Sequence, residues 1–402
     1  MIAKLRKLGP GFVFAGAAIG VSHLVQSTRA GADFGFGLLW ALLLINLVKY
    51  PFFEYGPRYA AATGQSLLHG YKKLGKGVLV TYFVLTFATM FTIQTAVTIV
   101  TAGIASSLFG GNTVLWTAII TGICFTILVI GRYKALDKLM KAIVICLTIS
   151  TIAAVVLATD NLDAVPFTQI IPTEAASLAF LIAFMGWMPA PLDISVWHSV
   201  WTVEKIKLEP SIDRKQSRFD FNVGYTATTI LAICFLALGG LVMFGSGTQF
   251  SSIGSEFANQ LIALYTTGLG ESAKLIIGIA ALTTMFSTTL TTLDGSPRVM
   301  HLSWELLRGK LFKRGYLLWL TLLVVGTLSI FFFFLSEMGT LVTIATILSF
   351  LTAPFYAIIN YILLSGKHTP KEARPSVYMK VLSIFGIVVL IGFSLWYLST
   401  LW

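Results

Sequence analysis

Apolar stretches of about 20 residues recur along the whole sequence, and a helix of that length crosses the hydrocarbon core of a bilayer. Only 11% of the 402 residues are charged and 56% are hydrophobic, whereas a typical soluble domain carries about 25% charged residues. The sequence therefore predicts an all-α polytopic membrane protein. Counting apolar windows gives roughly eleven spans. They cover residues 10–28, 36–62, 78–107, 113–131, 139–159, 176–202, 221–246, 271–299, 316–336, 339–365 and 378–401.

The basic residues that give the net charge of +11 lie mostly in short loops between these spans, such as 72–76, 205–218 and 308–314. The alternate loops hold mostly acids, including Glu174 and Glu256. Because cytoplasmic loops are enriched in Lys and Arg, we predict a cytoplasmic N-terminus and an external C-terminus. This distribution indicates a lipid bilayer as partner and no nucleic acid. The small amount of sequence outside the spans favours a bacterial plasma (inner) membrane.

The sixth predicted span contains two prolines, Pro189 and Pro191, where a membrane helix should run unbroken. Proline lacks an amide donor and clashes with the preceding turn, so we expect a break between Met188 and Pro191. Asp193 follows the break at membrane depth. A carboxylate inside a membrane indicates a functional site.

The first predicted span has a softer interruption, because Gly16, Gly20 and Ser22 lead into His23. Interrupted helices at matching positions of two halves indicate a transport site. We therefore expect one transmembrane domain over residues 1–402. It would consist of repeats of opposite orientation at 10–159 and 176–365, with an extra helix at 378–401.

Three stretches of this sequence resemble the NRAMP family of divalent-metal transporters. They are GPGFVFAGAAIG at 9–20, AGADFGFGLLWALLLINL at 30–47 and Met188-Pro189 in the sixth span. The resemblance implies a LeuT-type fold of two inverted five-helix repeats, with broken first and sixth helices. It also implies a secondary-active transporter that moves metal cations by alternating access. The metal would be a transported substrate, and no cofactor is implied.

The sequence departs from the family where the family binds metal and protons. The family's first-span Asp-Pro-Gly-Asn motif aligns with Gly20, Val21, Ser22 and His23, and its sixth-span Met-Pro-His histidine aligns with Ala190. Its third-span acids on the proton route have no counterpart, since the matching stretch offers Thr95 and Thr98. The resemblance therefore carries the fold, while the identity of the substrate and the proton coupling stay open.

The candidate substrate-binding residues lie near the two breaks: Gly20, Ser22, His23, Gln26, Met188, Ala190 and Asp193. Of these, His23, Met188 and Asp193 could hold a transition metal, since imidazole and thioether suit softer ions and carboxylate suits harder ones. The alternatives are that Asp193 caps the second half-helix or pairs with an arginine, and that His23 and Met188 are packing residues.

Charged pairs spaced four residues apart occur in the second and eighth spans, at Glu54 and Arg58 and at Asp294 and Arg298. This spacing predicts ion pairs within one helix. With Thr95 and Thr98, these residues are candidates for gating or coupling. Hydroxyls of the eighth span, at 287, 288 and 291, could also help to coordinate a monovalent cation.

Two transport functions remain open from the residues. The first is transport of a divalent metal cation through an altered site. The second is a Na⁺-coupled symporter of a small organic solute such as an amino acid, because a carboxylate-poor break suits a solute carboxylate bound by half-helix amides. No nucleophile–base set or phosphate loop indicates an enzyme.

Overall fold

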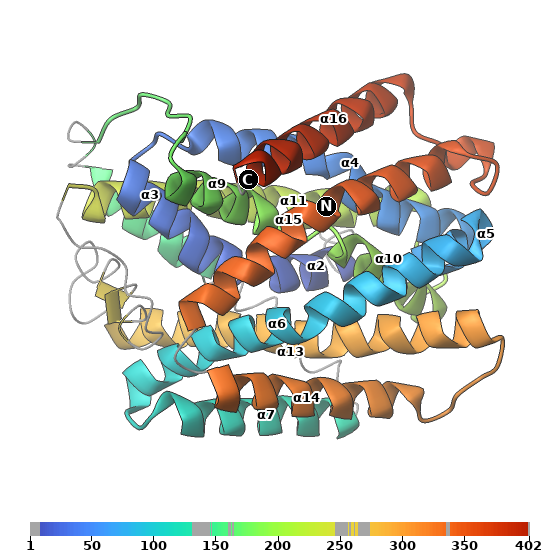
Figure 1. Cartoon of the computed structure of the whole chain (residues 1–402), viewed down its shortest axis with the longest axis horizontal. Helices are drawn as coiled ribbons and strands as arrows, with labels where there is room; N and C mark the ends of the chain where they lie inside the picture. Colours follow the sequence, from blue (N-terminus) through green and yellow to red (C-terminus); the bar gives the residue numbers. More distant parts are fainter. Residues whose placement is uncertain are drawn as a thin grey trace.

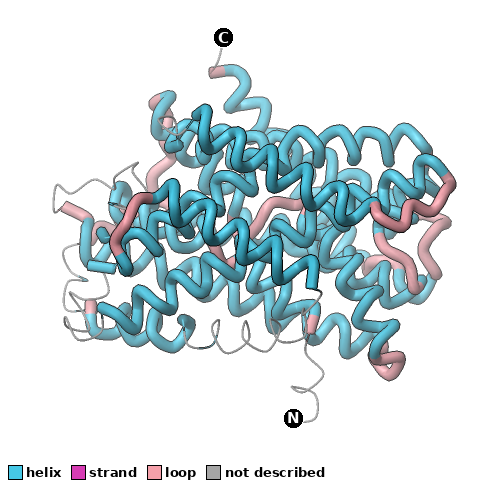
Figure 2. The backbone as a smooth tube through the Cα atoms, turned by 90° about the horizontal axis from the view of Figure 1, so that it is seen from below, coloured by secondary structure: helices cyan, strands magenta, loops and turns pink. Residues whose placement is uncertain are grey.

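The computed structural model describes residues 9–130, 145, 147–159, 162, 165–245, 256, 259–260, 262–263, 274–334 and 338–400. Throughout these residues the regular structure is helical, and Figure 2 shows the helices joined by short loops. Figure 1 shows that most of them run along the long axis of the molecule. The helices are α2 (Pro10–Ala18), η1 (Ser22–Ser27), α3 (Thr28–Phe34), α4 (Leu39–Thr63), α5 (Leu67–Leu74), α6 (Lys76–Phe109), α7 (Thr113–Ile130), α9 (Ala175–Trp187), α10 (Ile194–Leu208), α11 (Arg214–Met243), α13 (Lys274–Arg308), α14 (Gly315–Phe334), α15 (Met338–Ser365), η5 (Lys371–Ala373) and α16 (Val377–Ser399).

Each predicted span coincides with a described helix or with a broken pair of helices. The fifth does so only over Leu147–Leu157, since residues 139–144 and 146 lie outside the described part. By length and composition alone, six described helices can each cross a membrane, or seven if the bent pair α2 and η1–α3 counts as one span. The other spans are interrupted or carry charges, as α4 does at Lys49, Glu54 and Arg58. The protein is therefore an integral membrane protein.

Both expected helix breaks are present. The first span ends as an α-helix at Ala18 and resumes at Ser22 as a π-helix, with a bend of 47°. The sixth ends at Trp187 and resumes at Ile194, beyond both prolines. At the first break a Cβ on Gly20 would lie 2.7 Å from Cγ2 of Thr288, so only glycine lets this segment pack against α13.

The broken helices occupy the centre of the molecule. Helix α11 packs along α2, η1 and α3, while α4 packs along α10, and α15 along α9. Helix α13 packs against both α6 and α2. In Figure 1, α7 and α14 form one edge of the molecule and α16 lies at the opposite edge. These outer helices expose apolar side chains, such as Ile123, Val325 and Val388, as expected for helices in contact with lipid.

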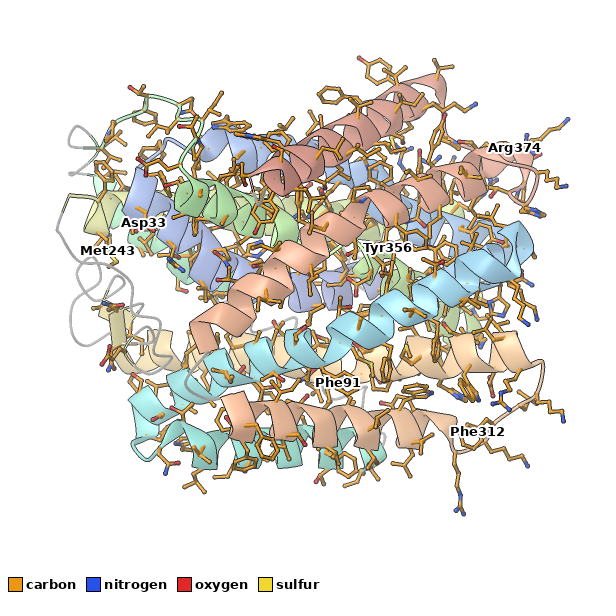
Figure 3. The ribbon with its side chains drawn as sticks, viewed as in Figure 1. Asp33, Phe91, Met243, Phe312, Tyr356 and Arg374 are labelled. Atoms are coloured by element: carbon orange, nitrogen blue, oxygen red, sulfur yellow. The ribbon has the colours of Figure 1, made fainter. Side chains whose placement is uncertain are left out.

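Figure 3 shows Asp33 and Met243 at one end of the long axis and Phe312 and Arg374 at the other. Asp33 and Met243 adjoin loops predicted to be external, and Phe312 and Arg374 lie in loops predicted to be cytoplasmic. The arrangement agrees with a chain that crosses the membrane back and forth. Which end faces the cytoplasm remains a prediction from loop charge.

Candidate functional site

A cavity lies between the two helix breaks. It is lined by Ala17, Ala18, Gly20, Val21 and Ser22 of the first span, Trp187, Pro191, Asp193, Ile194 and Trp197 of the sixth, Ile93 and Val97 of α6, and Thr288 and Thr292 of α13. The structure thus brings three of the predicted site residues, Gly20, Ser22 and Asp193, to one cavity. Because both breaks contribute to its wall, a bound ion would contact both broken helices.

Among the described residues that line this cavity, Asp193 is the only acid. Its side chain is 6% exposed, and its Oδ1 atom has no hydrogen-bond partner among the described residues. Asp193 occupies the N-cap position of α10, but its side chain makes no capping hydrogen bond. It also lines a second small cavity, with Ser349, Thr352 and Tyr356. A buried carboxylate oxygen without a partner is costly, and a ligand would explain it.

Lys49 provides a buried cation at the sixth-span break. Its Nζ donates to the carbonyl oxygens of Met185 at 2.8 Å, Gly186 at 2.7 Å, Met188 at 2.9 Å and Ala190 at 3.3 Å. The last carbonyls of a helix have no partner within the helix and carry partial negative charge. The second span therefore supplies the cation that satisfies the broken end of α9.

Lys49 thereby lies at the same break as Asp193, since its Nζ bonds the carbonyl oxygen of Ala190, three residues before Asp193. The sequence analysis did not assign this role to Lys49. The available signal was a single lysine deep in an apolar span of a chain that also contains a broken helix. The partner carbonyls lie 136 to 141 residues away in sequence, and no spacing rule connects them to Lys49.

His23 is fully buried and both of its ring nitrogens have partners. Nε2 lies 2.9 Å from the carbonyl oxygen of Thr228, and Nδ1 lies 2.8 Å from Oγ of Ser22. A carbonyl oxygen only accepts, so Nε2 carries a hydrogen. Oγ of Ser22 also lies 2.7 Å from the carbonyl oxygen of Ala18. His23 thus ties η1 to α11 and lies outside the cavity wall.

The remaining candidates also lie outside the cavity wall. The sulfur of Met188 accepts a hydrogen bond from Oγ of Ser27 at 3.8 Å. The carbonyl of Ala190 contacts Lys49, and Oε1 of Gln26 is buried without a partner among the described residues. Within the described ranges, no three His, Cys, Asp or Glu residues lie close enough to share a metal ion. The ligand roles of His23 and Met188 stay predictions.

An uncharged network joins α6 to α13 around Thr95 and Thr98. Thr95 and Thr98 donate to carbonyls of their own helix at 2.7 Å. Gln94 accepts from Oγ1 of Thr292 at 2.7 Å and donates to the carbonyl of Thr289 at 3.2 Å. These hydrogen bonds fix the two helices side by side without an ionisable group.

The ion pair predicted between Glu54 and Arg58 is confirmed, with 2.7 Å between Oε2 and Nε. Glu54 is 1% exposed, and Nε of Arg218 on α11 lies 3.9 Å from its Oε1. The pair therefore connects α4 to α11 through a second arginine. A cavity at this point is lined by Glu54, Pro57, Arg58, Arg214, Lys215, Arg218, Glu372 and Ala373.

The ion pair between Asp294 and Arg298 is also confirmed, with 2.6 Å between Oδ1 and Nη2. Asp294 further accepts from the hydroxyl of Tyr316 on α14 at 2.8 Å and from Nε1 of Trp201 on α10 at 3.4 Å. One carboxylate therefore joins the sixth, eighth and ninth spans.

Comparisons with known proteins agree with this architecture. A family model described as natural resistance-associated macrophage protein-like matches residues 11–400. The uncharacterized protein PM0681 of Pasteurella multocida is 36% identical, over 99% of this chain and 93% of its own. The divalent metal cation transporter MntH of Yersinia pestis is 23% identical, over 73% of this chain and 72% of its own.

Two solved structures share the fold at low sequence identity. A manganese transporter of Eremococcus coleocola is 13% identical, with a TM-score of 0.74 over 99% of this chain and 87% of its own. MhsT in complex with L-phenylalanine is 14% identical, with a TM-score of 0.66 over 96% of this chain and 98% of its own. The chain therefore has the LeuT-type fold that was expected from the sequence.

Proposed function

The chain belongs to the natural resistance-associated macrophage protein-like family, and on this premise we propose that it carries hard divalent metal cations across a membrane by alternating access. Relatives described as divalent metal cation transporters support the class of substrate. We further propose that residues 10–159 and 176–365 are inverted repeats, so that the ion passes between their first helices.

The observation that carries this proposal is the Oδ1 atom of Asp193. It is buried, it has no partner among the described residues, and it belongs to the cavity between the two breaks. A hard divalent ion prefers carboxylate, carbonyl and water ligands. Asp193, with the unwound backbone and the hydroxyls of Ser22 and Thr292, supplies ligands of this kind around the cavity.

The ligand set favours hard ions over soft ones. The imidazole of His23 is held by Ser22 and Thr228, and the sulfur of Met188 is held by Ser27. In this arrangement the soft donors do not reach the cavity. Lys49 partly offsets the charge of Asp193, so the site attracts a divalent ion weakly. An ion that keeps part of its water, such as Mg²⁺ or Mn²⁺, suits such a site.

We propose that transport does not use a proton route through the third span, because Thr95, Thr98 and Gln94 cannot release a proton at ordinary pH. The charged clusters at Glu54–Arg58 and Asp294–Arg298 would instead act as gates, since each joins different helices at one end of the bundle. The orientation with a cytoplasmic N-terminus and an external C-terminus, in a bacterial plasma membrane, belongs to the same proposal.

The test is uptake of Mg²⁺ and Mn²⁺ into proteoliposomes that contain the purified chain. We expect saturable uptake that falls about tenfold or more in Asp193→Asn, because a charged ligand contact contributes about 1.5–3 kcal/mol. Asp213→Asn is the matched control, since Asp213 caps α11 by accepting from the Gln216 amide and asparagine caps equally well. Its uptake should equal that of the wild type.

Two results would overturn the proposal. One is folded wild-type protein that takes up no metal. The other is an Asp193→Asn variant with unchanged uptake. Adding amino acids and sodium to the same vesicles distinguishes metal transport from the second candidate function, Na⁺-coupled transport of a small organic solute. Sodium-dependent accumulation of an amino acid, with no response to metal, would assign the cavity to an organic solute.

A further inference from the structure

The cavity beside the Glu54–Arg58 ion pair lies away from the two helix breaks, at the end of the bundle where Figure 3 shows Arg374. Its walls come from α4, α11 and η5. Its volume is about 280 Å³, compared with about 30 Å³ for the cavity between the breaks. Sites for small molecules begin at about 300 Å³, so this cavity has room for a small ligand rather than a single ion.

The charges that line this cavity are unbalanced. Four lining side chains are cationic and two are acidic: Arg58, Arg214, Lys215 and Arg218, and Glu54 and Glu372. The cavity therefore carries an excess of two positive charges, and we call it the basic cavity. An excess of this sign repels metal cations and attracts anions.

Glu54 is already engaged by the protein. Its Oε2 lies 2.7 Å from Nε of Arg58, and its Oε1 lies 3.9 Å from Nε of Arg218. Each guanidinium has five N–H donors, and one carboxylate cannot accept from all of them. Glu54 therefore holds the two arginines in place and leaves part of their donor capacity directed to another acceptor.

Arg214 and Lys215 have no such internal partner. Both are exposed, and neither forms an ion pair with a described residue. Asp213 is next in sequence, but its carboxylate accepts from the amide of Gln216 and it does not line the cavity. Two adjacent cations at the start of α11 thus border the cavity without a matching acid.

We propose that the basic cavity binds a phosphate monoester group or inorganic phosphate. Such a group carries about −1.5 to −2 charges near pH 7, which matches the excess of two positive charges. Arginine suits it because the guanidinium fork donates two parallel hydrogen bonds to phosphate oxygens. A bound phosphate joins α4, α11 and η5. This inference goes beyond the proposed function and does not depend on it.

The phosphate group has two possible sources with the same chemistry. One is a soluble phosphate from the adjoining solution. The other is a lipid with a monoester headgroup, such as phosphatidic acid, since basic pockets at the ends of membrane helices bind anionic headgroups. Phe219, next to Arg218, and Val377, four residues after Ala373, expose apolar side chains as expected for contact with lipid. The experiment therefore has one arm for each source.

The first arm measures binding of radioactive inorganic phosphate to the purified full-length chain by equilibrium dialysis in a neutral detergent. Chloride at equal ionic strength is the competitor. We expect one saturable site that chloride does not displace. Arg214→Gln should weaken binding about tenfold, because it removes a charged hydrogen-bond donor. Glu372→Gln should strengthen binding severalfold, because it raises the positive excess.

The second arm measures lipid retention in nanodiscs of phosphatidylcholine that contain either phosphatidic acid or phosphatidylglycerol. Phosphatidylglycerol is a diester with a single negative charge, so it should be retained less than phosphatidic acid. Mass spectrometry of the intact protein counts the retained lipids. Retention of phosphatidic acid that Arg214→Gln reduces assigns the cavity to a lipid, whereas binding in the first arm alone assigns it to a soluble phosphate.

Arg314→Gln is the matched control in both arms. Arg314 is an exposed arginine directly before α14, at the same end of the bundle, and it does not line the basic cavity. Its variant should bind as the wild type does. The site is excluded if neither arm shows binding that Arg214→Gln weakens more than Arg314→Gln. Weaker phosphate binding in Glu372→Gln would exclude it as well, because removing an acid from an anion site cannot weaken it electrostatically.

Discussion

The Nζ atom of Lys49 lies 2.7 Å from the carbonyl oxygen of Gly186, so a cation carried by the second span closes the broken end of a helix in the sixth. Lys49 is fully buried, so its ammonium has no contact with bulk solvent. The break in the sixth span is therefore a joint property of two helices. Proline interrupts the helix, and lysine makes the interrupted backbone tolerable inside a membrane.

We expect Lys49→Met to destabilise the protein by about 3 kcal/mol or more, because each buried carbonyl left without a donor costs about 1–3 kcal/mol. Thermal unfolding in detergent measures the loss. Lys205→Met is the control, since Lys205 forms a partly exposed pair with Glu209 and such pairs contribute about 0–1 kcal/mol. Equal melting temperatures for the two variants would mean that Lys49 does not support the break.

The positions of both breaks could be predicted from sequence because their causes are local. Pro189 and Pro191 lie two residues apart and remove two amide donors from one turn, and Gly20 weakens a helix. Single prolines, such as Pro297 in α13 and Pro354 in α15, lie inside continuous helices. The ion pair of Asp294 with Arg298 was predictable for the same reason, since four residues place them on one face of a helix.

The composition of the site could not be predicted in this way. His23 follows the first break and Met188 begins the second, yet the packing of α11 and η1 directs their polar atoms to Thr228 and Ser27. Which face of an unwound segment meets the cavity depends on neighbouring helices that are distant in sequence. The family resemblance predicted the fold correctly. Of the seven candidate substrate-binding residues, however, four lie outside the cavity wall: His23, Gln26, Met188 and Ala190.

The contacts of His23 predict a structural effect on mutation. His23→Ala removes the hydrogen bonds to Ser22 and Thr228, so we expect a loss of about 2 kcal/mol or more of stability. The metal dissociation constant should change by less than about threefold, because the imidazole does not line the cavity. Calorimetric titration with Mg²⁺, Mn²⁺ and Cd²⁺ measures that constant. A tenfold weakening would instead support the ligand role predicted from sequence.

Asp294 predicts an effect on the rate of transport rather than on affinity. It bonds Arg298, Tyr316 and Trp201, which lie on three helices. Hydrogen bonds to charged groups contribute about 1.5–3 kcal/mol, so losing them should shift the balance between conformations about tenfold or more. We expect Asp294→Asn and Tyr316→Phe to alter the uptake rate and leave the dissociation constant unchanged.

Glu204→Gln provides the control for this gate. Glu204 pairs with Lys207 at the surface, and its removal should leave the uptake rate within about twofold of wild type. A rate for Asp294→Asn equal to that of Glu204→Gln would exclude a gating role for Asp294.

Gly20 is the residue that the family resemblance aligns with an aspartate, and the structure predicts that introducing the acid alone fails. A Cβ at this position would meet Cγ2 of Thr288 at 2.7 Å and Oγ1 at 2.9 Å. We expect Gly20→Asp to destabilise the protein by about 1–3 kcal/mol through overpacking. Thr288→Ala removes both obstructing atoms. The double variant should therefore lose about 1 kcal/mol less stability than the two single variants lose in sum.

The same double variant tests the site itself, because it would place a second carboxylate in the cavity beside Asp193. Two carboxylates outweigh the single charge of Lys49, so we expect Mn²⁺ to bind about tenfold more tightly than to the wild type, which corresponds to about 1.4 kcal/mol. Gly77→Asp is the control, since a side chain there meets nothing within 4 Å. The proposal fails if the stability effects of Gly20→Asp and Thr288→Ala simply add in the double variant and its Mn²⁺ affinity equals that of the wild type. Gly20 and Asp193 would then not share a metal-binding cavity.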